Sequence, residues 1–266
     1  MPAELEPTHA EWWRAGSDRA LDRAIAATAD DDERAWAPQR AAGMLGAIVL
    51  VVIVFGSVVQ ALNLHDNWRA SWAEVIGELL LAAPVVYFAR PIARASGGWA
   101  RALGFGPPRW SDLPLAVGWT AVQLLARGVV GAILVALLPA AKHERVSNVP
   151  TLAGKPLTVL VPLIFAIVVM APIIEELAFR GVLLRSFMRR WGFQIGAVIT
   201  GLLFGGLHFE QAGGPSASVI LAATLALFGY LQAVLVRRTA RLAPVMMVHG
   251  MNNALGVIFA LHLHMR

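Results

Sequence analysis

Long apolar stretches separated by short polar ones make up the chain after residue 40. A helix needs about 17–25 apolar residues to cross the hydrocarbon core of a bilayer. Stretches that meet this length are predicted at 41–62, 72–89, 112–138, 157–190, 193–209, 218–236 and 242–261. The pattern therefore predicts an all-α fold, a polytopic transmembrane bundle of about seven to eight helices.

Local signals support these boundaries. Ser111 and Asp112 followed by Pro114 are typical of a helix start, and Gly213-Gly214-Pro215 separates the fifth span from the sixth. No repeat of fixed period is present. We therefore predict one transmembrane domain, 41–266, and a cytosolic N-terminal extension, 1–40. In the extension, apolar residues lie among charged ones, a pattern that favours an amphipathic helix on the membrane surface. The apolar residues are Trp12, Trp13, Leu21 and Ile25.

Composition agrees with a membrane protein. The chain is 58% hydrophobic and 15% charged, whereas soluble domains are about 45–50% apolar and about 25% charged. The net charge of +5 comes from arginines at the ends of apolar runs, where they set topology, so no nucleic-acid partner is expected. The absence of cysteine excludes disulfides, thiolate catalysis and cysteine-bound zinc. We expect a multi-pass protein of the cell membrane that has the lipid bilayer as a partner.

The distribution of positive charge predicts the orientation. The arginine-rich loops are 90–109, 185–190 and 237–241. The loops that are poorer in arginine or mixed in charge are 63–71, 139–156 and 209–217. Loops rich in Lys and Arg lie in the cytoplasm, and seven spans with a cytoplasmic N-terminus place all three rich loops there.

Two adjacent carboxylates and an arginine follow the apolar run 157–174. A charged side chain at the centre of a membrane helix costs at least about 2.5–3.5 kcal/mol, so such residues indicate a functional site. Glu176 and Arg180 are four residues apart and share one helix face, with the acid before the base. Glu175 is rotated by about 100° from that face and has no local partner. We predict that Arg180 holds Glu176, and that Glu175 is free for chemistry.

Three more polar residues lie inside apolar spans: His208, His249 and Asn253. Glu175 and His208 lie about 16 residues before and after the turn at Trp191-Gly192, so at ~1.5 Å per residue they reach the same depth. His249 and Asn253 are four residues apart and share a face. We predict that these groups converge on the cytoplasmic side of the membrane midplane, in a cavity that opens to the cytoplasm.

Such a cluster suits amide hydrolysis. A buried glutamate beside a histidine can act as general base on a water molecule, and an Asn amide with a second His can donate to the oxyanion. The substrate would be a peptide or a membrane protein. The alternative is a divalent metal such as zinc, bound by Glu175, His208 and His249, that activates the water. The HExxH zinc motif is absent, and we favour the metal-free mechanism.

Three motifs occur in order on these predicted helices. They are EExxxR at Glu175, Glu176 and Arg180, FxxxH at Phe204 and His208, and HxxxN at His249 and Asn253. Over about 109–266 the chain thus resembles the CPBP family, which comprises CAAX prenyl endopeptidases and bacteriocin-processing or Abi proteins, all polytopic intramembrane proteases. The resemblance implies these roles: Glu175 and His208 activate the water, His249 and Asn253 stabilise the oxyanion, and Glu176 and Arg180 support the site.

Other functions fit the same residues. A non-catalytic immunity or scaffold protein could keep the fold, and a transporter could use the buried carboxylates as a proton relay. Arg127, halfway along the third span, is expected either to pair with Glu78 or with the Glu175-Glu176 pair, or to line a polar substrate cavity. Small residues favour close helix approach at Gly201, Gly205 and Gly206.

Overall fold

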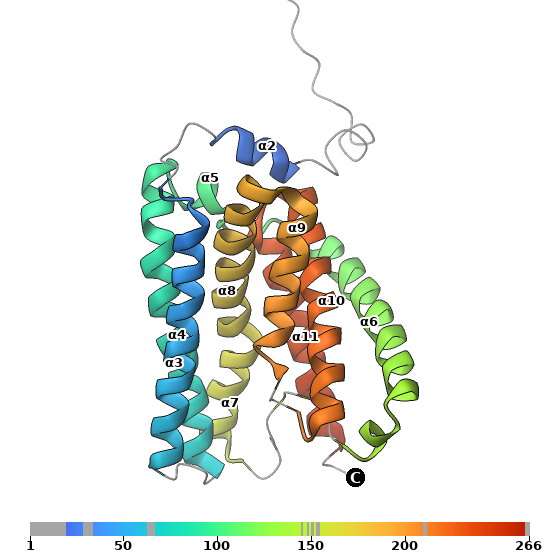
Figure 1. The fold of residues 1–266 in the computed structure, drawn as a ribbon. Helices are drawn as coiled ribbons and strands as arrows, with labels where there is room; N and C mark the ends of the chain where they lie inside the picture. Colours follow the sequence, from blue (N-terminus) through green and yellow to red (C-terminus); the bar gives the residue numbers. More distant parts are fainter. Residues whose placement is uncertain are drawn as a thin grey trace, which may run out of the picture.

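The computed structural model describes residues 20–28, 34–62, 67–144, 146–147, 149, 152, 155–209 and 212–263. All regular structure in these residues is helical, and the predicted fold class is confirmed. Six helices in the described part are long and apolar enough to cross a membrane. They stand side by side as one bundle (Figure 1).

The outer helices have the bounds α3 Pro38–Ala61, α4 Asn67–Ala95, α6 Asp112–Leu137, α10 Pro215–Thr239 and α11 Leu242–Leu263. Three short helices are α2 Ala20–Ala26, α5 Trp99–Leu103 and η1 Pro139–His143. The central segments are α7 Leu157–Phe165, η2 Ala166–Met170, α8 Ala171–Glu176, η3 Leu177–Leu183 and α9 Leu184–Gly206. Helix α4 exceeds the predicted span 72–89, because polar residues at both of its ends continue the helix.

The central segments form one apolar run, Leu157–Gly206, that counts as a single candidate span. The run bends at Gly192, whose φ of 78° is accessible to glycine at little cost. The chain folds back there, so the second leg of α9 lies beside the first and packs on α10 (Figure 1). The two legs correspond to the fourth and fifth predicted spans.

Helices α9 and α10 approach closely, as predicted from glycine. A Cβ atom at Gly201 would lie 2.8 Å from the Ala226 carbonyl oxygen, and one at Gly205 would collide with the Ala222 carbonyl. These two predictions are confirmed. A Cβ at Gly206 would meet no atom within 4 Å, so this glycine is not needed for the contact.

The end of the bundle that carries the arginine-rich loops is covered by α2, by the turn at 34–36 and by α5 (Figure 1). We call it the closed end. Leu21 of α2 is fully buried, and α2 packs against α10. The predicted residues Trp12 and Trp13 lie outside the described residues, as does the 1–19 part of the predicted extension.

Candidate active site

The helix that carries the glutamates is irregular at the level where α11 meets it. Pro172 has no N–H, so it cannot bond the carbonyl of Val168, four residues earlier. Gly250 of α11 lies against that carbonyl, since a Cβ there would be 2.8 Å from the Val168 oxygen. Asn253 donates through Nδ2 to the carbonyl of Ile167, 2.8 Å away. The π-helical segment η2 thus offers backbone oxygens to α11, and π-bulges of this kind are frequent at functional sites.

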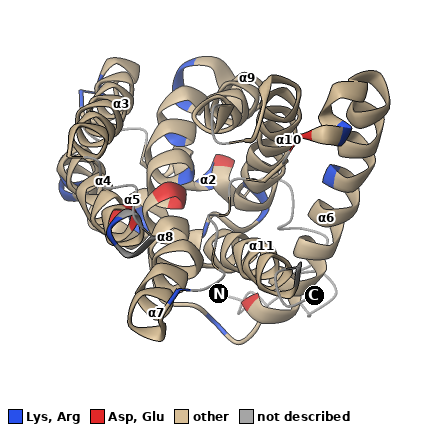
Figure 2. Cartoon of the chain, turned by 90° about the horizontal axis from the view of Figure 1, so that it is seen from below, with Lys and Arg blue, Asp and Glu red and all other residues tan. Residues whose placement is uncertain are grey.

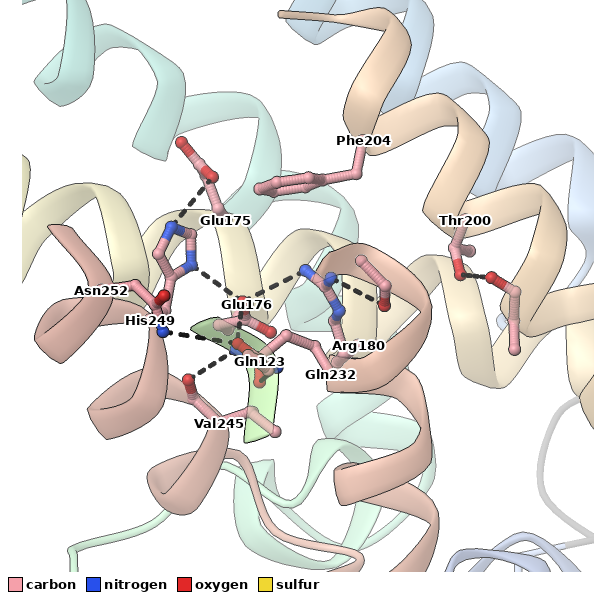
Figure 3. A network of polar contacts seen from close by, with 12 residues as sticks. Gln123, Glu175, Glu176, Arg180, Thr200, Phe204, Gln232, Val245, His249 and Asn252 are labelled. Atoms are coloured by element: carbon pink, nitrogen blue, oxygen red, sulfur yellow. Dashed lines mark hydrogen bonds and ion pairs between the residues drawn. The ribbon is translucent and has the colours of Figure 1, made fainter. Parts of the chain in front are cut away.

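Glu176 lies at the centre of a buried polar network (Figure 3). Its Oε1 accepts from Arg180 Nη1 at 3.1 Å, from Gln232 Nε2 at 3.2 Å and from His249 Nδ1 at 2.9 Å. The side chain is 0% exposed. The predicted pairing of Glu176 with Arg180 is confirmed, and two further donors bind the same oxygen.

Arg180 is buried with its partners. Its Nη2 donates to the carbonyl of Gly229 at 3.0 Å, and its guanidinium lies 5.0 Å from the centre of the Phe204 ring. A Cβ at Gly229 would lie 2.9 Å from the Cα of Gly201, so only glycine allows this approach of α10 to α9. The sequence therefore creates a closed pocket for one ion pair between α8, η3 and α10.

Glu175 has different surroundings. Its side chain is 23% exposed, and its Oε2 lies 3.8 Å from His249 Nε2 (Figure 3). No hydrogen-bond partner for this oxygen exists among the described residues. The sequence predicted that Glu175 points toward His208, but no ion pair joins these two residues in the described structure. His249 therefore lies between the two glutamates, with one ring nitrogen toward each.

His208 lies just after the end of α9 and lines the same cavity as Glu175. Its Nδ1 is 2.7 Å from the carbonyl oxygen of Phe204. A carbonyl only accepts, so Nδ1 carries a proton and donates it to this oxygen. Phe204 is 1% exposed and contacts the rings of both His208 and His249. Phe204 thus fixes the two imidazoles by packing.

A chain of amides leads from the Glu176 network to the cavity, and sequence reasoning missed it. Gln232 accepts from Gln123 at 3.1 Å, Gln123 accepts from Asn252 at 3.4 Å, and Asn252 accepts from Arg127 at 3.4 Å. Gln123 and Gln232 are 0% exposed. A lone amide in an apolar span was the available signal, since amides commonly bond across membrane helices. Arg127 lines the cavity as one alternative predicted, and no described acid forms an ion pair with it.

The candidate site opens into a cavity of about 880 Å³ between α3, α4, α8 and α11. Predicted site residues in its wall are Glu175, His208, His249 and Asn253. Additional charged residues in the wall are Glu74, Glu78 and Arg127. Figure 2, which views the bundle from the end opposite the closed end, shows acidic positions on α4 and α8. The structure thus brings four of the six predicted site residues to one cavity and places Glu176 and Arg180 behind it.

The position of the cavity bears on the prediction about its opening. It reaches Ser147 and Val149, in the segment that follows η1, at the end opposite the closed end. We expected the cavity to open on the arginine-rich side. None of the lining residues belongs to the closed end, where Arg185 donates to the carbonyls of Ala102 and Ala240, so the lining does not support an opening on the arginine-rich side.

The family model described as Type II CAAX prenyl endopeptidase Rce1-like matches residues 157–255. This stretch is therefore similar to the Rce1-like family. The match confirms the resemblance to the CPBP family. A search of curated proteins and a search of solved structures found no match.

The matched stretch contains all six predicted site residues, from Glu175 to Asn253. The rest of the cavity wall comes from α3, α4 and α6, which precede this stretch. The family match supports a CAAX-protease-like endopeptidase, and the six apolar helices show a multi-pass membrane protein.

The metal alternative has a clear geometric requirement. Glu175, His208 and His249 would have to surround one ion, and the free Nε2 of each imidazole is a suitable donor. In the part of the chain that the structure describes, no group of three or more His, Asp or Glu side chains is close enough to hold a metal. The residues as placed do not fit a metal centre.

Proposed function

We propose that this protein is an intramembrane endopeptidase that hydrolyses peptide bonds in the cavity, with water activated by Glu175. The observation that carries the proposal is the contrast between adjacent carboxylates. The Oε2 atoms of both residues have no hydrogen-bond partner among the described residues. Glu176, however, is fully buried and its Oε1 accepts three hydrogen bonds, whereas Glu175 is 23% exposed and lies in the cavity wall. A carboxylate kept free in a largely apolar cavity suits a general base.

Glu176 orients His249 for this reaction. A carboxylate accepts, so His249 Nδ1 donates to Glu176 Oε1 at 2.9 Å, and the neutral ring presents the lone pair of Nε2 to the cavity. Nε2 and Glu175 Oε2 are 3.8 Å apart, a separation that a bridging water can span. We assign the attacking water to this position, between Glu175 and His249.

The proton steps follow from these roles. Glu175 takes a proton from the water as the water oxygen attacks the carbonyl carbon of the substrate. The resulting oxyanion accepts from the second N–H of Asn253 Nδ2, whose first N–H is bonded to Ile167. Glu175 then returns its proton to the amide nitrogen, and the C–N bond breaks. His208, which the family resemblance assigns to activation of the water together with Glu175, lines the same cavity.

Peptide hydrolysis by the purified full chain tests the proposal. Glu175→Gln keeps the size of the side chain and removes the base, so we expect cleavage of a quenched fluorescent peptide library to fall by about 10²–10⁴-fold. His208→Ala should also lower it. Asp22→Asn is the matched control, because Asp22 belongs to α2 at the closed end and does not line the cavity. Full cleavage by Glu175→Gln, with an unchanged unfolding temperature, would contradict the assignment.

Two further measurements separate the alternatives. Activity that survives dialysis against a chelator supports the metal-free mechanism, whereas loss of activity that zinc restores would assign the water to a metal. Solute uptake by proteoliposomes without any peptide cleavage would support a transporter. A protein that does neither would support the scaffold or immunity function.

A further inference from the structure

The cavity is confined to one half of the bundle. Along α3 its wall runs from Ile48 to Val59, and on α11 it runs from His249 to Gly256, so both helices contribute their parts far from the closed end. Leu242 begins α11 at the closed end, and at ~1.5 Å per residue His249 lies about 10 Å further in. Beyond that depth the wall continues to Ser147 and Val149 at the opposite end.

The closed end is sealed by specific bonds. Arg185, which is 1% exposed, donates to the carbonyls of Ala102 at 3.3 Å and Ala240 at 2.8 Å. These bonds tie α5 and the corner between α10 and α11 to the central hairpin. The corner also lies close to the end of α5, because the N–H of Leu242 donates to the carbonyl of Gly104. Gly104 ends α5 with a φ of +71°, a conformation that favours glycine.

Helix α2 adds a second layer of contacts at the same end. Arg189 stacks over the Trp36 ring at 4.2 Å and donates to the carbonyl of Thr28 at 3.2 Å. Arg237 forms an ion pair with Asp22 at 3.0 Å. These arginines are therefore bound to the protein's own backbone and carboxylates, and no described residue of the closed end lines the cavity.

The charge distribution orients the two ends. Loop and flanking arginines at the closed end are Arg23, Arg34, Arg40, Arg90, Arg94, Arg101, Arg109, Arg189, Arg190, Arg237, Arg238 and Arg241. The basic residues described at the opposite end are Arg69, Lys142 and Lys155. An excess of this size in short loops places the closed end in the cytoplasm.

We propose that the site takes its substrate from the non-cytoplasmic side of the membrane. The substrate class is then a peptide segment that has already crossed the membrane, or the non-cytoplasmic flank of a membrane protein. This inference rests on the proposed endopeptidase function for its substrate, but the access route stands on the cavity and the charges alone. The volume of about 880 Å³ lies within the ~300–1,000 Å³ typical of ligand pockets, which suits a few residues of an extended chain.

The access route can be measured without any substrate. The chain contains no cysteine, so a single introduced cysteine is the only target for a maleimide. Ser147→Cys marks the mouth of the cavity, Glu74→Cys marks its wall, and Arg190→Cys marks the closed end. We expect a membrane-impermeant maleimide to label the first two in sealed right-side-out vesicles, and to label Arg190→Cys only after detergent permeabilisation or in inverted vesicles.

The opposite labelling pattern would overturn the proposal. Labelling of Arg190→Cys from outside shows that the closed end is not cytoplasmic, and labelling of Glu74→Cys only in inverted vesicles shows that the cavity faces the cytoplasm. Labelling after permeabilisation serves as the control that each variant is present and folded enough to react.

A second experiment connects access with activity. A membrane-impermeant quenched peptide library should be cleaved by right-side-out vesicles and not by inverted ones, and Glu175→Gln should abolish the difference. Cleavage by inverted vesicles alone would overturn the access route. If neither vesicle type cleaves while the maleimide pattern is as expected, the proposed function fails and the access route stands.

Discussion

Charged side chains that are buried or half-buried lie at two levels of this bundle, and their surroundings differ. At the closed end Arg185 donates to two backbone carbonyls, and Arg237 has an aspartate partner. In the cavity wall Arg127 has one hydrogen bond of 3.4 Å, and the Oε2 atoms of Glu78 and Glu175 have no partner among the described residues. A buried charge is costly unless it is paired and hydrogen-bonded. Buried Nε atoms without a partner occur at the closed end too, in Arg185 and Arg237. Because the terminal nitrogens of these two arginines bind other groups of the protein, we expect them to stabilise the fold, and we expect the charges in the cavity to be available to a ligand.

Glu176 and Arg180 lie between these regions and belong to both. They are buried and hydrogen-bonded like Arg185 of the closed end, yet Glu176 also binds the imidazole that faces Glu175. Breaking this pair should therefore lower both the stability and the peptidase activity. A change at the closed end should lower the stability alone, and a change in the cavity wall should lower the activity alone.

Arg180→Met should give the largest loss of stability. It leaves the carboxylate of Glu176 buried without its cation, and breaking a buried ion pair in this way costs about 3–5 kcal/mol. Thermal unfolding in detergent, followed by circular dichroism, measures the change. Glu176→Gln in the same chain removes the uncompensated charge and should recover part of the stability. If the double variant Arg180→Met/Glu176→Gln is as unstable as Arg180→Met alone, the unpaired charge of Glu176 is not the cause of the lost stability.

Arg185→Met should cost less and act on the fold alone. It leaves the carbonyls of Ala102 and Ala240 without a donor, at up to about 1–3 kcal/mol each, offset in part because a buried charge is removed. We expect a net loss of about 2–3 kcal/mol in the free energy of unfolding. The folded fraction should cleave peptides at the wild-type rate. A loss of activity without a loss of stability would show that the closed end contributes to the site.

Arg127→Met should have the smallest effect on stability. Its single long hydrogen bond contributes little, and removal of a charge from an apolar wall is favourable, so the free energy of unfolding should change by no more than about 1 kcal/mol. Any effect should appear in peptide hydrolysis instead. Unfolding measured in parallel with Arg185→Met provides the matched comparison of two arginines. If Arg127→Met and Arg185→Met lower the free energy of unfolding equally, the charges of the cavity wall and of the closed end do not differ in their contribution to stability.

Much of this arrangement was predictable from the sequence. Helix number, the hairpin at Gly192 and the pairing of Glu176 with Arg180 follow from hydrophobic length and from the spacing of four residues on one helix. The depth argument also placed Glu175, His208, His249 and Asn253 at one level, and all four line one cavity. These properties depend on distance along the chain, which a helix converts directly into position.

Other properties depend on how the helices rotate and tilt against one another, and no spacing encodes them. Segments of π-helix precede and follow α8, and the ionic contact of Glu175 in the described structure is with His249 and not with His208. Gln123 and Gln232 meet Glu176 because α6 and α10 pack at that level. Positive charge predicted which end is cytoplasmic, but which end is hollow was settled by packing. Arginine side chains at the closed end bind their own backbone, and at the far end the helices leave the cavity open.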